Sequence, residues 1–371
     1  MESFVVSARK YRPLGFDEVV GQEHITTTLK NAIDNDHLAQ ALLFCGPRGV
    51  GKTTCARILA RMVNGFEAET GDAVSNFNIY ELDAASNNSV EDIRNLIDQV
   101  RYPPQQGKFK VYIIDEVHML SNQAFNAFLK TLEEPPSYAI FILATTEKHK
   151  VIPTILSRCQ IFDFNRIEIK DIVDQLQKIA ETEGIDAEED ALHLIAQKAD
   201  GALRDALSIF DLIVTFSSDN KITYQNTIDN LHILDYEYYF RVADLFLEEN
   251  IGGVLLIFDE ILSKGFDGHN FLVGLEEHFR NLMVCKDSET LKLLQVSENV
   301  RQKYQEQAAS FSPSYILSAL NLLNQSDLSY KSSKNQRLHV ELALMKLSQL
   351  NKAIKLANVS TSENGVKKKV M

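Results

Sequence analysis

The sequence predicts an α/β domain built on a parallel sheet, followed by two helical domains. Three observations lead to this prediction. Short apolar runs rich in β-branched and aromatic residues alternate with helical patterns over residues 1–165. One of these runs leads directly into a glycine-rich loop. After Phe164 the strand-like runs give way to amphipathic helical spacing. We therefore expect domains at 1–165, 166–230 and 231–356, with a flexible tail at 357–371.

Five runs in the first domain are expected to form strands. Apolar residues nearly throughout a strand are typical of a parallel sheet that is covered on both faces. Ser89 is expected to cap a helix between the second and third strands, because the acidic Asp92 follows three positions later. The predicted strands are residues 41–45, 78–82, 110–114, 139–144 and 161–164.

The rest of the chain is expected to be helical. Ile172, Val173, Leu176 and Ile179 have helical spacing in the second domain. In the third domain, glycines at 252–253 and 265–268 predict breaks between helices. The last strong helix carries an apolar face, expected to consist of Leu338, Leu342, Met345 and Leu350 or their neighbours.

Composition limits the classes of partner. The formal net charge of −13 argues against a protein that coats nucleic acid by bulk charge, so any DNA contact would come from a few placed basic residues and helix N-termini. No run of 18 apolar residues and no charged leader before an apolar stretch are present, so no membrane span or secretory signal is expected. The 4 cysteines lack C-x-x-C spacing, which argues against a disulfide framework and fits a reducing cytoplasm.

The glycine-rich loop predicts a phosphate-binding site. Residues 46–53 read GPRGVGKT and match G-x-x-x-x-G-K-[ST] between a predicted strand and a predicted helix. Backbone N–H groups and the helix N-terminus would face the phosphates, Lys52 would reach the β- and γ-phosphates, and Thr53 would bind Mg²⁺. The residues expected to hold the nucleotide here are Gly46, Pro47, Arg48, Gly49, Val50, Gly51, Lys52, Thr53 and Thr54.

A pair of carboxylates follows the third predicted strand. Asp115 is expected to hold Mg²⁺, directly or through water, and Glu116 to orient and polarise an attacking water. Thr145 and Thr146 end the next strand, where a polar side chain would sit between the phosphate loop and Asp115 and detect the γ-phosphate. In this order along the chain, the motifs predict a nucleoside-triphosphate hydrolase core.

Several motifs together resemble the tau/gamma subunit family of bacterial DNA polymerase III. The resemblance is dense over residues 4–212, and residues 335–347 are similar to the final helix of the family. The matching stretches are 8–13 (ARKYRP), 19–24 (VVGQEH), 113–120 (IIDEVHML), 126–136 (NAFLKTLEEPP), 157–159 (SRC) and 203–206 (LRDA).

The resemblance implies an AAA+ P-loop NTPase domain, a small helical lid domain and an all-α collar domain that makes an oligomer. It implies that Arg158 is an arginine finger acting on the ATP of a neighbouring subunit, and that Arg204 contacts the γ-phosphate within its own subunit. A guanidinium suits both roles because it keeps its charge and can bind phosphate oxygens with two N–H groups. The resemblance also places five residues beside the adenine: Arg9, Tyr11, Pro13, Val19 and Val20.

The implied function is that of the ATPase subunit of a clamp loader, part of the DNA polymerase III holoenzyme, a DNA-directed DNA polymerase and hence a transferase. ATP and Mg²⁺ would be its cofactors. The implied partners are other loader subunits, the sliding clamp, primer–template DNA held by its backbone and, indirectly, single-stranded DNA-binding protein. By resemblance, residues 117–125 would face the clamp, and the helix beginning near Ser89 offers N–H groups for a DNA phosphate.

The sequence departs from the family pattern in one segment. Residues 64–74 stand where many members carry a four-cysteine zinc module, and they contain no cysteine, so no zinc is expected. The chain also has the length of the short, loader-only form. Two alternatives stay open: a branch-migration helicase motor, which would carry a winged-helix domain in place of a collar, and a loader-like scaffold that binds ATP without turnover.

Overall fold

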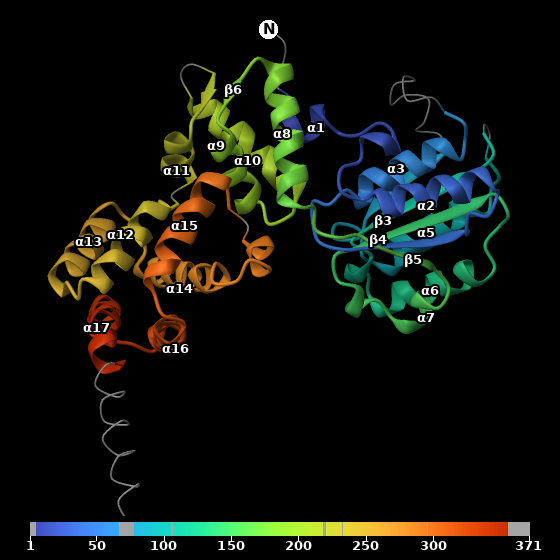
Figure 1. The fold of residues 1–371 in the computed structure, drawn as a ribbon. Coiled ribbons are helices and arrows are strands. Elements are labelled where there is room, and N and C mark those ends of the chain that lie inside the picture. The colour runs from blue at the N-terminus through green and yellow to red at the C-terminus, as the bar shows by residue number, and fades with distance from the viewer. Residues whose placement is uncertain are drawn as a thin grey trace, which may run out of the picture. The chain divides into compact units, whose positions relative to one another are not determined.

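The computed structural model describes residues 5–66, 78–104, 107–217, 220–231, 233–294 and 296–354. The chain divides into two compact units, Met1–Thr223 and Tyr224–Met371, whose elements are labelled in Figure 1. The expected tail at 357–371 lies outside the described residues, as does most of the segment that replaces the zinc module.

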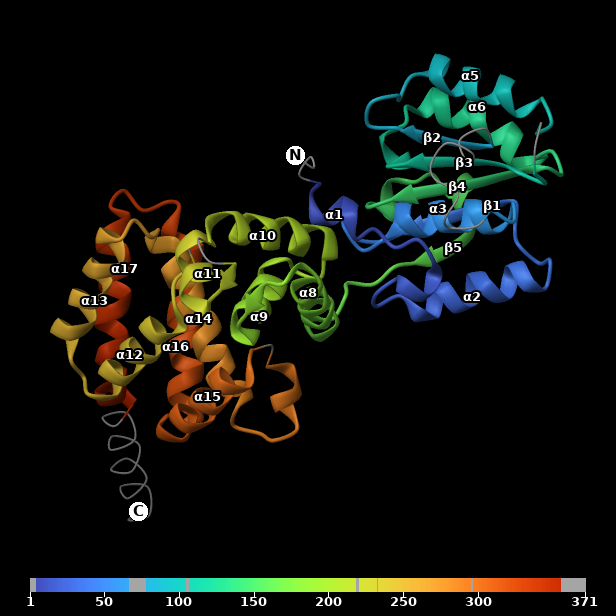
Figure 2. The ribbon, with the colours of Figure 1, turned by 90° about the horizontal axis from the view of Figure 1, so that it is seen from above.

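The first unit is built on a five-stranded parallel sheet. Its strand order is β2-β3-β4-β1-β5, which Figure 2 shows across the sheet. All five predicted strands are confirmed, each with both ends within one residue of the prediction. The strands are β1 (Ala41–Cys45), β2 (Ile79–Asp83), β3 (Lys110–Asp115), β4 (Ala139–Thr145) and β5 (Gln160–Asp163).

Helices cover both faces of this sheet, as the apolar strands predict. Leu43 and Cys45 of β1 share a buried cluster with residues of α5 (Val90–Val100), α6 (Asn122–Glu133) and α7 (Pro153–Leu156). Leu42 and Phe44 point to the other face and share a cluster with α2 (Glu23–Asp34) and α3 (Lys52–Met62). In Figure 1, α2 and α3 accordingly lie above the sheet and α6 and α7 below it. Full burial of each large apolar side chain contributes roughly 1.5–3 kcal/mol.

The predicted helix start at Ser89 is confirmed. The Ser89 hydroxyl accepts a hydrogen bond from the backbone N–H of Asp92 at 3.2 Å, and the Asp92 carboxylate accepts one from the backbone N–H of Ser89 at 3.1 Å. This reciprocal capping box satisfies N–H groups that the first turn of α5 leaves without helical partners. It also places a carboxylate at this helix N-terminus, so a DNA phosphate would meet a negative charge there.

The remainder of the first unit is mainly helical. Ile172, Leu176 and Ile179 are buried on one face of α8, as their spacing predicts, whereas Val173 is only half-buried. A short parallel pair, β6 (Asp186–Ala187) with β7 (Lys221–Ile222), was not expected from the sequence. The other elements are α1 (Ser7–Lys10), η1 (Phe16–Glu18), η2 (Val117–Met119), η3 (Lys148–Lys150), α8 (Ile169–Glu183), α9 (Glu189–Lys198) and α10 (Leu203–Phe216).

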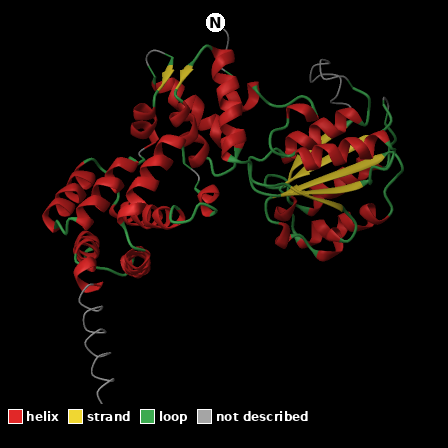
Figure 3. Ribbon diagram, viewed as in Figure 1, coloured by secondary structure: helices red, strands yellow, loops and turns green. Residues whose placement is uncertain are grey.

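Among the described residues of the second unit, the regular elements are all helices, which Figure 3 colours differently from the strands of the first unit. Within the described residues, no helix combines the length and apolar character that crossing a bilayer demands. The helices of the second unit are α11 (Tyr224–Leu231), α12 (Tyr236–Leu247), α13 (Ile251–Ser263), α14 (Gly268–Val284), η4 (Thr290–Leu293), α15 (Glu298–Ser310), α16 (Pro313–Tyr330) and α17 (Gln336–Ser348).

Two expectations for this unit need correction. The break expected at glycines 252–253 falls just before them, because Asn250 caps α13 and accepts a hydrogen bond from the Gly253 N–H at 2.9 Å. In α17, Leu338 and Leu342 are exposed, whereas Val340, Ala343, Leu344 and Leu347 form the buried face. The helix is apolar on more than one side, so spacing alone does not choose the face that packs inward.

Candidate functional site

A cavity of about 380 Å³ lies in the first unit, at the edge of the sheet where β2 and β3 end. Such a position, outside the carboxyl ends of parallel strands, is where α/β proteins bind ligands, and the volume suits a small molecule. The lining comes from the N-terminal segment, the glycine-rich loop, the two strand ends and α10. Its residues are Ala8, Tyr11, Arg12, Pro13, Val19, Val20, Arg48, Gly49, Val50, Gly51, Lys52, Thr53, Thr54, Asp83, Asp115, Glu116, Ile167, Leu203, Arg204 and Leu207.

The loop between β1 and α3 has a backbone that demands glycine. Gly51 has φ of 102° and directly precedes the first residue of α3. A Cβ on Gly46 would lie 2.4 Å from the carbonyl oxygen of Phe164, so no side chain fits at that position. The free N–H groups at the start of α3 and the helix dipole favour a bound anion here.

Lys52 lies in the first turn of α3 and is buried. Its Nζ donates hydrogen bonds to the carbonyl oxygens of Gly46 and Pro47, each at 2.7 Å. Burial lowers the pKa of Lys52, while the nearby carboxylates of Glu116 and Asp115 act in the opposite direction. The ammonium group therefore lies between the loop and two carboxylates, where it can neutralise charge on a phosphate.

Thr53 and Asp115 meet although they are far apart in the sequence. The Thr53 hydroxyl donates to Asp115 Oδ2 at 2.7 Å, and Asp115 Oδ1 accepts from the Glu116 N–H at 2.9 Å. A hydroxyl and a carboxylate side by side are hard oxygen ligands that fit Mg²⁺, which completes its shell with water and phosphate oxygens. Among the described residues, no group of three or more His, Cys, Asp or Glu side chains is placed to hold a metal ion. The oxygens of Thr53 and Asp115 are of the ligand type that suits Mg²⁺.

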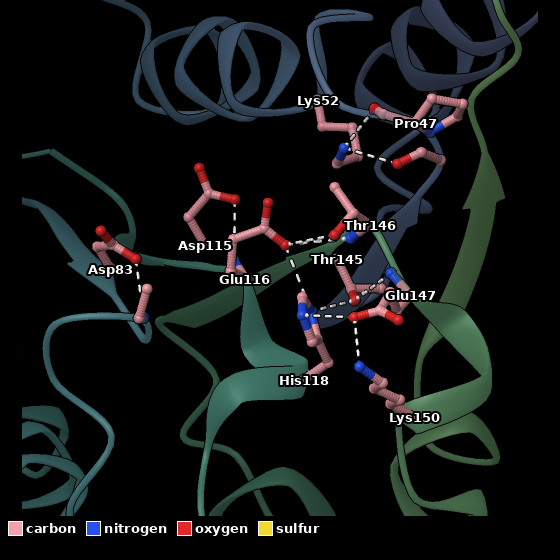
Figure 4. A network of polar contacts seen from close by, with 12 residues as sticks. Pro47, Lys52, Asp83, Asp115, Glu116, His118, Thr145, Thr146, Glu147 and Lys150 are labelled. Atoms are coloured by element: carbon pink, nitrogen blue, oxygen red, sulfur yellow. Dashed lines mark hydrogen bonds and ion pairs between the residues drawn. The ribbon is translucent and has the colours of Figure 1, made fainter. Parts of the chain in front are cut away.

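Glu116 follows Asp115 in an unusual backbone conformation. Its φ is 48°, in the left-handed region that a residue with a Cβ enters only at a cost, on the order of 1 kcal/mol. This turn brings the side chain to the end of β4. There Glu116 Oε2 accepts hydrogen bonds from Thr146 Oγ1 at 2.9 Å and from Thr146 N–H at 3.2 Å, as Figure 4 shows. Thr146 thus contacts Glu116, although it is not among the described residues that line the cavity.

The residues expected beside the adenine are only partly brought together. Tyr11, Pro13, Val19 and Val20 line the cavity, whereas Arg9 is exposed and is not part of the described lining. Asp83, Ile167 and Leu207 line it without having been singled out from the sequence. Asp83 could have been found, because it directly follows a predicted strand just as Asp115 does. Ile167 and Leu207 gave no such signal, since the folding of the helical segment brings them to the cavity.

The two expected arginines lie in different places. Arg204, at the start of α10, lines the cavity, and its backbone N–H donates to the Gly49 carbonyl at 3.4 Å. Arg158 is exposed and is not part of the described lining. Its guanidinium instead donates to Glu133 at 2.6 Å and to the Thr154 carbonyl at 2.8 Å. The hydrogen-bond partners of Arg158 therefore lie outside the cavity lining.

Three family models match consecutive parts of the chain. Residues 21–168 match the model described as DNA polymerase III, delta subunit. Residues 171–219 match the ATPase lid domain of the DNA polymerase III clamp loader subunit. Residues 222–359 match domain III of the DNA polymerase III subunits gamma and tau. The three matches follow the order of an α/β domain, a helical lid and a helical domain.

Curated relatives agree with these models. DNA polymerase III subunit tau of Bacillus subtilis is 38% identical over 94% of this chain and 64% of its own length. The tau subunit of Escherichia coli is 42% identical over 74% of this chain and 44% of its own length. The chain thus spans about half to two thirds of these two relatives. DNA polymerase III subunit gamma of Buchnera aphidicola is 33% identical over 94% of this chain and 98% of its own length.

Solved structures match less closely. The Thermotoga maritima RuvB Holliday junction branch migration motor is 21% identical, with a TM-score of 0.48 over 64% of this chain and 80% of that chain. The Bacillus subtilis DNA clamp loader delta protein is 16% identical, with a TM-score of 0.39 over 87% of this chain and 99% of that chain.

The fold agrees with the family models and relatives. The parallel sheet with its glycine-rich phosphate loop is an AAA+ P-loop domain, followed by a helical lid and an all-α domain. A relative of nearly the same length is matched over almost its whole chain, and the match includes the all-α domain. The chain therefore belongs to the gamma/tau family of DNA polymerase III subunits.

Proposed function

We propose that this chain is the ATPase subunit of a bacterial clamp loader, in which ATP binding and hydrolysis drive the opening of a sliding clamp and its loading onto primed DNA. The observation that supports this most directly is the grouping of Lys52, Thr53, Asp115 and Glu116 on one cavity. The family membership adds the assembly in which such a cavity would work.

The residues expected to act at the cavity have the following proposed tasks. The N–H groups of the glycine-rich loop and Lys52 hold the triphosphate, and Tyr11, Pro13, Val19 and Val20 border the adenine. Thr53 and Asp115 hold Mg²⁺, which neutralises charge on the phosphates when it is bound. Glu116 orients the attacking water, with Thr146 as its hydrogen-bond partner. Arg204 reaches the γ-phosphate from the lid.

Arg158 is proposed to act on a neighbouring subunit. It is exposed and lies outside the lining of its own cavity, so it is free to meet a phosphate on another chain. Its Glu133 partner is a half-exposed carboxylate, and such surface pairs contribute only about 0–1 kcal/mol. Exchanging Glu133 for a triphosphate at a subunit interface therefore costs little. Hydrolysis would then depend on assembly.

The proposed partners are other loader subunits through the helical second unit, the sliding clamp through residues 117–125, and primer–template DNA through its backbone. Contact with single-stranded DNA-binding protein would be indirect, and the site of action would be the cytoplasm. Polymerisation itself would belong to the holoenzyme that the loader serves. The N-terminus of α5 is a poor site for DNA, because Asp92 places a carboxylate on its N–H groups.

The test is the ATPase rate of the assembled loader, measured with and without clamp and primed DNA. Stimulation by clamp and DNA together is expected. A branch-migration motor would respond to branched DNA without a clamp, and a non-hydrolysing scaffold would bind ATP with no turnover under any condition.

A Lys52→Ala variant is the first prediction. Removing the ammonium group should abolish retention of ATP, because the charge that balances the phosphates is lost. Equilibrium binding of a fluorescent ATP analogue measures this, and Lys108→Ala, an exposed lysine outside the cavity lining, is the matched control. Unchanged affinity in Lys52→Ala would contradict the assignment of the cavity.

A further inference from the structure

His118 lies behind Glu116 and is held on both edges of its ring. Its side chain is only 6% exposed. Nδ1 lies 3.0 Å from Thr145 Oγ1 and 3.3 Å from Glu116 Oε2, and Nε2 lies 3.2 Å from Glu147 Oε2. Figure 4 shows the ring between these groups. The described lining of the cavity includes Glu116 but not His118, so the imidazole acts on the cavity only through another side chain.

The far edge of the ring is anchored to a fixed group. Glu147 Oε2 also accepts a hydrogen bond from Lys150 Nζ at 2.7 Å, and the Glu147 N–H donates to Thr145 Oγ1 at 3.0 Å. The hydrogen bond from Lys150 is the main cause of a lowered pKa for Glu147, which therefore stays a carboxylate. The two ring nitrogens of His118 therefore each face a carboxylate, Glu147 at Nε2 and Glu116 at Nδ1.

The near edge of the ring restrains the carboxylate that is proposed to orient water. His118 and Thr146 both contact Oε2 of Glu116, from different directions. Figure 4 shows the second carboxylate oxygen turned away from both of them. Since the backbone of Glu116 is already fixed in the left-handed region, two contacts on one oxygen leave the carboxylate little freedom to rotate.

We propose that His118 is a positioning residue that sets the orientation of the Glu116 carboxylate by linking it to Glu147. This role rests on the proposed ATPase function. It places the control of the water-orienting group on the segment after β4, in addition to the Thr146 contact. A misplacement of a reacting group by about 1 Å can cost roughly a hundredfold in rate, without any change in substrate binding.

Two substitutions of His118 distinguish its contact with Glu116 from its contact with Glu147. In His118→Asn the amide nitrogen can take the place of Nδ1 beside Glu116, and in His118→Gln it can take the place of Nε2 beside Glu147. Both are measured in the assembled loader with clamp and primed DNA, as kcat for ATP and as Kd for a fluorescent ATP analogue. His118→Asn, which keeps the contact with Glu116 but loses the one with Glu147, should lower kcat by up to about tenfold. His118→Gln, which loses the contact with Glu116, should lower it by about a hundredfold, and both variants should keep an unchanged Kd.

His149→Gln is the matched control, because His149 is an exposed neighbour 3.8 Å from the Glu147 carboxylate, and it should leave kcat unchanged. Equal kcat values in His118→Asn and His118→Gln would overturn the positioning role. A loss of activity that is explained by a higher Kd would overturn it as well. If either His118 variant does not fold, Glu147→Gln, at a side chain that is 35% exposed, gives the answer. It should lower kcat at constant Kd, and an unchanged kcat would refute the link. A wild-type assembly without turnover would instead refute the proposed function, and this role with it.

Discussion

At the scale of single residues, the backbone brings together groups that the sequence keeps far apart. Thr53 touches Asp115, and Glu116 touches Thr146, because the strands that carry or precede them end at the same edge of one parallel sheet. The sequence motifs identified these residues by type and order. They could not reveal His118, because an imidazole three positions after Asp115 becomes informative only when Glu147 lies at its other edge.

Replacing the single side chain of Arg158 tests its proposed action on a neighbouring subunit. Arg158→Ala should leave the Kd for ATP unchanged, because the side chain lies outside its own cavity lining. It should reduce the clamp- and DNA-stimulated turnover of the assembly by about a thousandfold, as expected for loss of an arginine finger. Single-turnover hydrolysis and equilibrium binding measure the two quantities.

Arg101→Ala is the matched control for this experiment, because Arg101 is likewise exposed and paired with an acidic side chain, Asp98. It should behave as the wild type. Full stimulated activity in Arg158→Ala would rule out its action on a neighbouring subunit.

At the scale of elements, prediction succeeded where one physical signal dominates. The inner strands β1, β3 and β4 are buried along almost their whole length, so their apolar runs marked them clearly. The edge strands β2 and β5 are largely exposed or half-buried, yet shorter apolar runs still marked both to within one residue. The capping box at Ser89 and Asp92 is equally local, and it was found. Spacing failed in α17, where Val340 and Leu344 pack inward while Leu338 and Leu342 stay exposed. The β6–β7 pair was missed because two-residue strands carry no periodicity.

A buried histidine in α14 should make the stability of the second unit depend on pH. His278 contacts Tyr304 Oη at 3.1 Å and Gln307 Oε1 at 2.8 Å within the second unit. Burial lowers the pKa of His278 from 6.5 to about 4. The unfolded chain therefore binds a proton between these two values that the folded chain does not, and the free energy of unfolding falls as pH falls through this window.

Between pH 7 and pH 5 the second unit should lose about 2 kcal/mol of stability from this group. Hydrogen exchange of the α14 amides at the two pH values, corrected for intrinsic rates, measures the loss. His278→Gln should show a smaller dependence on pH over this range, whatever its stability at pH 7. An unchanged pH dependence in that variant would assign the effect to other groups.

At the scale of the whole molecule, hydrogen bonds connect the N-terminal segment of the first unit to helices α8 and α10. Ser7 donates its N–H to Asp211 of α10 at 2.7 Å, and Tyr11 and Lys10 both contact Glu183 at the end of α8. Since Tyr11 also lines the cavity, a bound nucleotide would contact the segment that these bonds attach to the lid. The cavity is therefore built by tertiary folding, which explains why the sequence motifs identified only part of its lining.

Limited trypsin digestion tests this linkage. Cleavage after the exposed Arg9 and Lys10 should slow when a non-hydrolysable ATP analogue and Mg²⁺ are added, by up to about a hundredfold at one hundred times Kd. Cleavage after Lys292, exposed in the second unit, should not change. Lys52→Ala should show no protection at either position, and equal protection of Lys292 would point to a different effect of the nucleotide.

The pairing of the strands has a practical consequence for handling this protein. Asp83 stands opposite Asp115, and Cys45 opposite Thr145, so the polar strand ends meet only in one alignment of the sheet. If β3 slipped by one residue during refolding, its apolar side chains would exchange faces and Asp115 would move away from Thr53. A preparation can then be sorted by passage over immobilised ATP, with the retained fraction containing the correctly aligned chains.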